Sequence, residues 1–233
     1  VVIASRKEEA LQVAAKKLTK YGTCHAKSCD IREPEAIEEL AKMIQETLGG
    51  LDILINNAGG QFPAPANIIA QKGWAAVINN NLNGTFYMSQ LISNKFFIPQ
   101  KSGNIVNITA NVSRGFPGMA HTGAARAGVE NLTKSLGQEW ARYHIRVNAV
   151  APGIIATSGL ENYPSQMQEF LKDSEQKNLM KRFGTAEDVS NTVLFLSSPL
   201  ANYISGVTIP VDGLEHLAGD RMELYNKIMS FTN

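Results

Sequence analysis

The sequence has little cysteine, few aromatic residues and almost no net charge. Cys24 and Cys29 are the only cysteines among 233 residues, which excludes a disulfide-stabilised framework and favours a reducing compartment. The net charge is +1, so nothing indicates a nucleic-acid partner or an anionic membrane surface. No apolar run approaches the ~20 residues that span a bilayer. The four histidines lack metal-ligand spacing, so no metal site is predicted.

Apolar residues, by contrast, make up 44% of the chain, which suits one domain, 1–233, with a full core. Short β-branched runs alternate with amphipathic helical patterns. This alternation predicts an α/β fold, a Rossmann-like doubly wound parallel sheet with helices on both faces. The less regular stretch 154–180 is expected to form a substrate lid. The expected strands are 1–5, 22–31, 51–60, 103–109, 145–153 and 206–213, and the expected helices are 7–21, 33–50, 81–96, 120–140 and 185–198.

In such a sheet, ligands bind beyond the carboxyl ends of the strands. Ser5, Arg6 and Lys7 follow the first strand. In a dinucleotide fold an acid at this place accepts the 2′-OH of NAD, whereas a hydroxyl and two cations suit a 2′-phosphate. The residues therefore predict NADPH, and an ordinary solvated basic turn is the alternative.

Three more loops stand at expected strand ends. Asp30 could accept a hydrogen bond from an adenine amino group, cap the helix 33–50, or do both. The glycines of "NNAGG", 56–60, let the backbone approach a ligand closely, although such turns also occur as plain loops. Asn81 stands at the expected start of the helix 81–96, either as an N-cap or with a role in the site.

The fifth strand ends at Pro152 and Gly153, which force a turn. The backbone of Ile155 and the hydroxyl of Thr157 could hold a carboxamide such as that of nicotinamide. A plain strand-ending turn would explain the same residues.

Together these motifs resemble the short-chain dehydrogenase/reductase family over nearly the whole chain. The segments that carry the resemblance are "LDILINNAGG", "NLNGTF", "GNIVNIT", "IRVNAVAPGIIAT" and "EDVSNTVLFLSSPLANYISGVTIPVDG". Within that family, "NNAGGQFPAPA" and "GFPGMAHTGAARAGVENLTKSL" are similar to the trans-2-enoyl-CoA reductases of peroxisomes, with the 2,4-dienoyl-CoA reductases as the nearest other branch. The resemblance implies an acyl-CoA substrate and a peroxisomal location, with cytoplasm or mitochondrion as the alternatives. It also implies that NADPH contacts Ser5, Arg6, Lys7, Asp30, Ile31, Asn57, Ala58, Gly59, Arg126, Pro152, Gly153, Ile155 and Thr157.

Most members of the family use a Ser, a Tyr and a Lys together with an Asn. The resemblance puts Thr109 at the Ser position, Thr122 at the Tyr position and Arg126 at the Lys position, while Asn81 matches the Asn. A Thr hydroxyl is too weak an acid to replace Tyr, and Arg cannot pass a proton. Both changes count against the reduction of a carbonyl group.

Reduction of a 2-enoyl thioester makes a smaller demand, because negative charge develops on the thioester oxygen and needs only stabilisation. A hydroxyl and a fixed cation can supply it. The predicted reaction is therefore NADPH-dependent reduction of the C2=C3 double bond of trans-2-enoyl-CoA thioesters. The alternatives are a carbonyl, 3-hydroxyacyl or 2,4-dienoyl-CoA oxidoreductase, or a catalytically inactive NADP-binding relative.

Other acids remain open. Asn111 and Ser113 are placed to point into the site, and Tyr163 of the lid could close over substrate or lie on the surface. Glu130, one turn beyond Arg126, is expected to form an i,i+4 ion pair with that arginine.

Two features of the expected helices have plain explanations. His121 is expected to be an ordinary side chain at the start of the helix 120–140. Apolar stripes fit either core packing or the dimer interface that the resemblance implies, which makes a homo-oligomer the expected assembly. Their members are Met88, Leu91, Ile92, Phe96, Val129, Leu132 and Leu136.

The resemblance also implies a strand and a Gly-rich phosphate loop ahead of Val1. That strand would lie between the strands 1–5 and 51–55. Without it, each buried unpaired backbone group on their edges costs about 1–3 kcal/mol. We therefore expect the sequence to lack roughly 40 N-terminal residues, enough for a strand, a loop and a helix.

Overall fold

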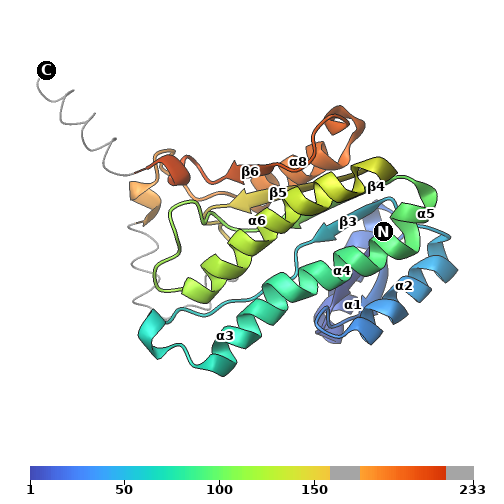
Figure 1. The fold of residues 1–233 in the computed structure, drawn as a ribbon, viewed down its shortest axis with the longest axis horizontal. Coiled ribbons are helices and arrows are strands. Elements are labelled where there is room, and N and C mark those ends of the chain that lie inside the picture. The colour runs from blue at the N-terminus through green and yellow to red at the C-terminus, as the bar shows by residue number, and fades with distance from the viewer. Residues whose placement is uncertain (158–173, 219–233) are drawn as a thin grey trace, which may run out of the picture.

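The computed structural model describes residues 1–157 and 174–218, and within them all strand pairs are parallel (Figure 1). The strands form two sheets, one in the order β1-β2 and one in the order β3-β4-β5-β6. The predicted α/β fold with a parallel sheet is confirmed. The strands are β1 Val2–Ser5, β2 His25–Ser28, β3 Ile53–Asn56, β4 Gly103–Ile108, β5 Ile145–Pro152 and β6 Thr208–Val211.

The helices follow the expected ranges closely, with one exception. Helical structure starts at Gln71 rather than at 81, because π-helical turns at Asn79–Asn83 and Ser93–Phe97 join three helices end to end. The asparagines near position 80 are poor helix formers, which concealed the first part of this segment. The helices are α1 Glu8–Leu18, α2 Pro34–Leu48, α3 Gln71–Ile78, α4 Gly84–Ile92, α5 Ile98–Gln100, α6 Ala120–Trp140 and α8 Ala186–Ser197.

Helices cover both faces of the larger sheet. In Figure 1, α4 and α6 lie in front of it and α8 lies behind. Successive residues of β4 alternate between the two layers, since Ile105 packs with Ile92 and Leu136 whereas Val106 packs with Leu196. The doubly wound arrangement expected from the sequence is therefore present.

The two sheets are not joined to each other by hydrogen bonds in the described part of the chain. β1 and β3 each have one edge without a strand partner among the described residues, and on β3 the residues Ile53 and Ile55 are 40% and 39% exposed. This is the place at which the sequence predicted a further strand, and that expectation stays a prediction. No helix among the described residues has the length and apolar character needed to cross a membrane.

Candidate active site

Arg126 stands at the centre of the carboxyl edge of the larger sheet. Its Nη1 donates a hydrogen bond to the carbonyl oxygen of Ile108, 2.8 Å away, at the end of β4. Its guanidinium lies so close to Gly59 that a Cβ added there would collide with Nη2. Within the described residues no carboxylate pairs with it. Burial lowers the pKa of Arg126 to about 10, the signature of a cation held without a counter-charge.

Asn81 fastens the helical segment to the glycine loop. Its Nδ2 donates to the carbonyls of Gly60, at 2.7 Å, and Val77, at 2.8 Å, while its Oδ1 accepts from the N–H of Gly60 at 3.3 Å. Asn81 is buried in the middle of a π-helical turn, so the N-cap interpretation is wrong. Irregular turns of this kind are frequent at functional sites. Asn81 Oδ1 also lies 2.8 Å from the position that a Cβ on Gly59 would take, which brings it beside Arg126.

A chain of buried amides holds this edge together from below. Asn56 Nδ2 donates to Ser89 Oγ at 2.9 Å and to Asn107 Oδ1 at 2.8 Å, and Asn107 Nδ2 donates to Thr133 Oγ1 at 2.9 Å. These bonds link β3, β4, α4 and α6. Asn56 of the "NNAGG" segment therefore links β3 to β4, while Asn57, Ala58 and Gly59 are left exposed at the edge.

Thr122 lies on α6 one turn before Arg126 and is fully buried. Its hydroxyl is 3.3 Å from Nδ1 of His121, which also accepts the Thr122 backbone N–H at 2.8 Å. His121, at the start of α6 as expected, is itself fully buried against the ring of Phe62, with ring centroids 4.5 Å apart. Within the described chain no hydrogen bond joins Thr122 to Arg126.

Thr109 follows β4 and is buried, and its hydroxyl donates to the carbonyl of Val150 at 3.2 Å. The expected ion pair between Glu130 and Arg126 is wrong, because Arg126 turns toward the β4 carbonyl. Burial raises the pKa of Glu130, and Lys134 and the Thr109 side chain offset part of the rise. The carboxyl group therefore faces Thr109 and not Arg126.

The loops after β4 and β5 touch each other. The Asn111 N–H donates to the Pro152 carbonyl at 3.0 Å, and the Asn111 side chain accepts from Ser113 Oγ at 2.9 Å. Gly153 lies against the turn that follows β6. Ile155 bridges to residue 184 and Thr157 is exposed at the end of the described segment. Tyr163 and most of the expected lid fall outside the described residues.

The ends of β1 and β2 form the second part of the predicted site. Ser5, Arg6 and Lys7 are exposed there, as a phosphate-binding turn would have to be. Arg6 helps to lower the pKa of Asp30, which places the two at the same edge.

Asp30 does not cap α2, whose N-cap is Glu33 without a side-chain bond, so that expectation is wrong. Its carboxylate binds Arg32 instead, through Nε at 2.9 Å and also through Nη2 and the backbone N–H. The Arg32 hydrogen bonds lower the pKa of Asp30 to about 2. Sequence reasoning missed Arg32, although an Asp two residues before an Arg could have indicated the pair. Ile31 between them packs on Gly84.

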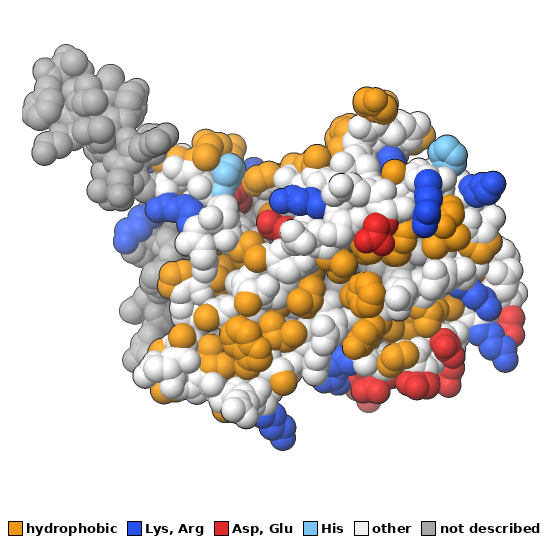
Figure 2. All heavy atoms as spheres, viewed as in Figure 1, with side chains coloured by type: hydrophobic (Ala, Val, Ile, Leu, Met, Phe, Trp, Pro, Cys, Tyr) orange, Lys and Arg blue, Asp and Glu red, His pale blue; other side chains and the backbone are white. Residues whose placement is uncertain are grey.

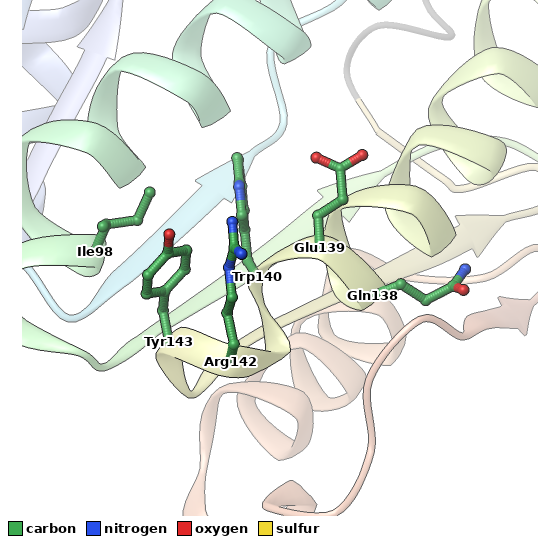
Figure 3. A pocket seen from close by; sticks show the side chains of 6 residues that line it. All are labelled: Ile98, Gln138, Glu139, Trp140, Arg142 and Tyr143. Carbon is green, nitrogen blue, oxygen red and sulfur yellow. The ribbon is translucent and has the colours of Figure 1, made fainter.

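Two hollows of the surface lie at different distances from the candidate site. A hollow of about 280 Å³ lined by Arg32, Glu33, Asn79 and Tyr87 borders the β2 edge. A larger one, about 490 Å³, lies at the far end of α6, next to the amino end of β5, and therefore away from Arg126. Figure 3 shows the side chains that line it, which are Ile98, Gln138, Glu139, Trp140, Arg142 and Tyr143.

These features fit a dinucleotide. An exposed basic turn stands at one end. At the other end the backbone at 57–59 is exposed, and Gly59 lacks the Cβ that would collide with Arg126. An unpaired cation under that backbone suits an electron-rich ligand.

Comparisons with known proteins agree with this description. Residues 1–213 match the family model described as enoyl-(acyl carrier protein) reductase. The chain is 38% identical over 233 residues to the peroxisomal 2,4-dienoyl-CoA reductase of Rattus norvegicus, covering 97% of this chain and 77% of that protein. A short-chain dehydrogenase from Bacillus anthracis superposes with a TM-score of 0.85 at 38% identity, covering 94% and 87% of the two chains. A polyketide ketoreductase for actinorhodin, solved with NADPH, gives 0.88 at 28% identity, covering 94% and 88%.

Proposed function

Since the chain belongs to the short-chain dehydrogenase/reductase family of oxidoreductases, we propose that it catalyses the NADPH-dependent reduction of the C2=C3 double bond of trans-2-enoyl-CoA thioesters. The observation that carries this proposal is the guanidinium of Arg126, which is partly buried and has no carboxylate partner among the described residues, at the position where the resemblance puts the family's Lys. A buried cation without a counter-charge stabilises an oxyanion strongly, because little solvent screens it.

The family binds nicotinamide dinucleotides, and NADPH is our proposal for this chain. Ser5, Arg6 and Lys7 would hold the 2′-phosphate, with Arg6 able to bind it through two parallel hydrogen bonds. The backbone at 57–59 would lie along the cofactor, and the Pro152–Thr157 segment would hold the carboxamide. When bound, the reduced nicotinamide supplies the hydride.

The chain's own task is then to stabilise an enolate. We propose that Arg126 and the Thr122 hydroxyl face the thioester oxygen, where negative charge accumulates as the double bond is reduced. Arg126 is preorganised for this by its bond to the Ile108 carbonyl and by Asn81 beside it. Loss of one such donor typically costs about 2.7–4 kcal/mol of transition-state stabilisation.

A 2,4-dienoyl-CoA substrate is the second candidate, favoured by the name of the rat relative. Its reduction also leaves an enolate, so the same residues would serve it. Carbonyl reduction fits less well, because neither Thr122 nor Arg126 can deliver a full proton to an alkoxide at neutral pH.

The test is NADPH oxidation by the protein with three thioesters of the same chain length: trans-2-decenoyl-CoA, 2,4-decadienoyl-CoA and 3-oxodecanoyl-CoA. We expect turnover with the first, and a roughly hundredfold or greater loss of kcat in Arg126→Met. Arg142→Met is the matched control, since Arg142 is an exposed arginine just beyond the other end of the same helix. Turnover of the 3-oxo thioester alone would overturn the proposal.

We also propose a homo-oligomer and a peroxisomal location. Figure 2 shows apolar side chains gathered on the face that carries α4 and α6, the two helices with the predicted stripes. The rat relative is named as peroxisomal. Sedimentation of the purified protein and imaging of a tagged copy would test the two proposals separately.

A further inference from the structure

Asp212 and His216 form an ionisable pair to which the proposed function gives no role. In the turn after β6, Asp212 Oδ2 is 2.8 Å from Nδ1 of His216 and accepts the His216 backbone N–H at 2.8 Å, while Oδ1 accepts the Leu214 N–H at 3.1 Å. The Asp212 side chain is 2% exposed and the His216 side chain 26%. Since a carboxylate can only accept, the His216 proton is on Nδ1. The ring is fixed and its Nε2 is left without a partner in the described chain.

This pair stands at the same edge of the sheet as Arg126. β6 is the parallel neighbour of β5, and Pro152 pairs with Val211. Asp212, the next residue after Val211, is therefore level with Gly153, the next residue after Pro152. A Cβ on Gly153 would meet Glu215 Oε2 at 2.6 Å and Asp212 at 2.8 Å. In Figure 1 the turn after β6 lies on the side toward which the strands point and on which α6 starts.

The loop after β4 also reaches this turn. Arg114 Nη1 donates to the carbonyl of Ala218, and Asn111 donates to the Pro152 carbonyl at 3.0 Å. Asn178 Nδ2 closes the other side with a bond of 3.3 Å to the Asp212 carbonyl. The turn with His216 is therefore tied to the loops that follow β4 and β5, at the sheet edge on which Arg126 lies.

We propose that His216, oriented by Asp212, is the general acid that protonates C2 of the enolate, the step for which Thr122 and Arg126 are chemically unsuited. This inference rests on the proposed enoyl-thioester reduction. The enolate electron pair forms the new C2–H bond. The Nε2–H bond of the imidazolium breaks with its electrons staying on nitrogen, and solvent then returns a proton to the ring. Histidine is the side chain suited to such transfer near neutral pH.

Among the described residues, few other charged groups lie near the ring. Asp212 binds it directly, and Glu215 stands on the same turn, where burial and the Asp212 charge raise the pKa of Glu215. Arg114 approaches from the loop after β4 through the Ala218 carbonyl.

His216→Asn tests the role, because an Asn amide can still donate to Asp212 but cannot carry the proton. His144→Asn is the matched control, an exposed histidine at the opposite edge of the sheet, where a left-handed φ of 59° also suits Asn. With trans-2-decenoyl-CoA we expect kcat/KM to fall about a hundredfold in His216→Asn only. The fall of kcat/KM at alkaline pH that we expect for the wild type should be absent in His216→Asn. In D2O the wild-type product should carry deuterium on one face of C2, and the variant product on both.

A binding measurement keeps this inference separate from the proposed function. The imidazole NMR signal of His216, assigned by its absence in His216→Asn, should shift when saturating decanoyl-CoA is added to the protein without cofactor. A signal that does not move would overturn the inference, whatever the turnover. Unchanged pH profile and unchanged deuterium placement in an active His216→Asn variant would also overturn it and leave a purely structural turn. Absence of wild-type turnover with all three thioesters would instead refute the proposed function.

Discussion

Two groups of positive charge lie at the carboxyl ends of the strands: the single side chain of Arg126, and the pair Arg6 and Lys7. They differ in burial and in the contacts that hold them. Arg126 is partly buried, has no carboxylate partner among the residues that the structure describes, and is fixed against Gly59, Asn81 and a β4 carbonyl. Arg6 and Lys7, at the end of β1, are exposed and have no such frame. The first group suits charge stabilisation, which needs a donor fixed before the reaction. The second suits the capture of a charged ligand from solvent, where screening makes each contact weak.

The largest effect is expected from a substitution that crowds Arg126. In Gly59→Ala the new Cβ would collide with Arg126 Nη2 and lie 2.8 Å from Asn81 Oδ1. We expect a loss of about 1–3 kcal/mol in the free energy of unfolding, together with loss of activity. The control is Gly50→Ala, where nothing lies within 4 Å of the added Cβ. Chemical denaturation of both variants measures the difference, and equal stabilities would mean that Arg126 gives way without cost.

The next substitution is expected to raise the free energy of unfolding instead of lowering it. Arg126→Met removes a partly buried cation that has no counter-charge among the described residues, so the protein without ligand should gain about 1–3 kcal/mol at neutral pH while losing activity. The folded-state pKa of about 10 lies below the ordinary 12.5, so between these values the unfolded chain binds more protons. Wild-type stability relative to the variant should therefore rise as the pH increases through 10. Melting of both proteins from neutral pH to pH 11 tests this, and a constant gap would contradict it.

The surroundings of Arg126 show which structural features could be predicted from the sequence. The parallel sheet and the loops at the strand ends follow from alternating patterns, and they correctly brought Gly59 and Arg126 to one edge. Spacing alone did not show which way side chains turn. Glu130 is an i,i+4 neighbour of Arg126, yet the arginine bonds to a strand carbonyl and the carboxylate faces Thr109. Such choices depend on tertiary contacts that helical periodicity does not contain.

Asn81 and Asp30 teach the same lesson at longer and shorter range. Besides the local Val77 carbonyl, Asn81 binds Gly60, 21 residues away, and no local pattern shows that contact. The partner of Asp30 is Arg32, near enough in the sequence to have been considered. Cap preferences are local averages, and a nearby guanidinium competes successfully for the carboxylate.

The exposed pair should respond more mildly and only toward its ligand. Arg6→Ala is expected to raise the KM for NADPH about tenfold, equivalent to about 1.4 kcal/mol, with kcat and the KM for NADH unchanged. Lys16→Ala in the last turn of α1 is the control, an exposed cation away from the strand end. Because the site is open to solvent, the wild-type KM for NADPH should rise with salt. Equal effects on NADPH and NADH would contradict a 2′-phosphate contact.

The smallest effect belongs to the ion pair beside Arg6 and Lys7. Asp30 is drawn to a pKa of about 2 by Arg32, below the ordinary 3.8, so its contribution to stability is complete above 3.8 and is lost as the pH falls through 2. Both side chains are partly exposed, at 23% for Asp30 and 37% for Arg32, so solvent screening limits the contribution to less than about 1 kcal/mol. Asp30→Asn should therefore lower the free energy of unfolding slightly and equally between pH 5 and 8, and the gap to wild type should close only in acid. A gap that changes between pH 5 and 8 would show that a group other than Asp30 controls this edge.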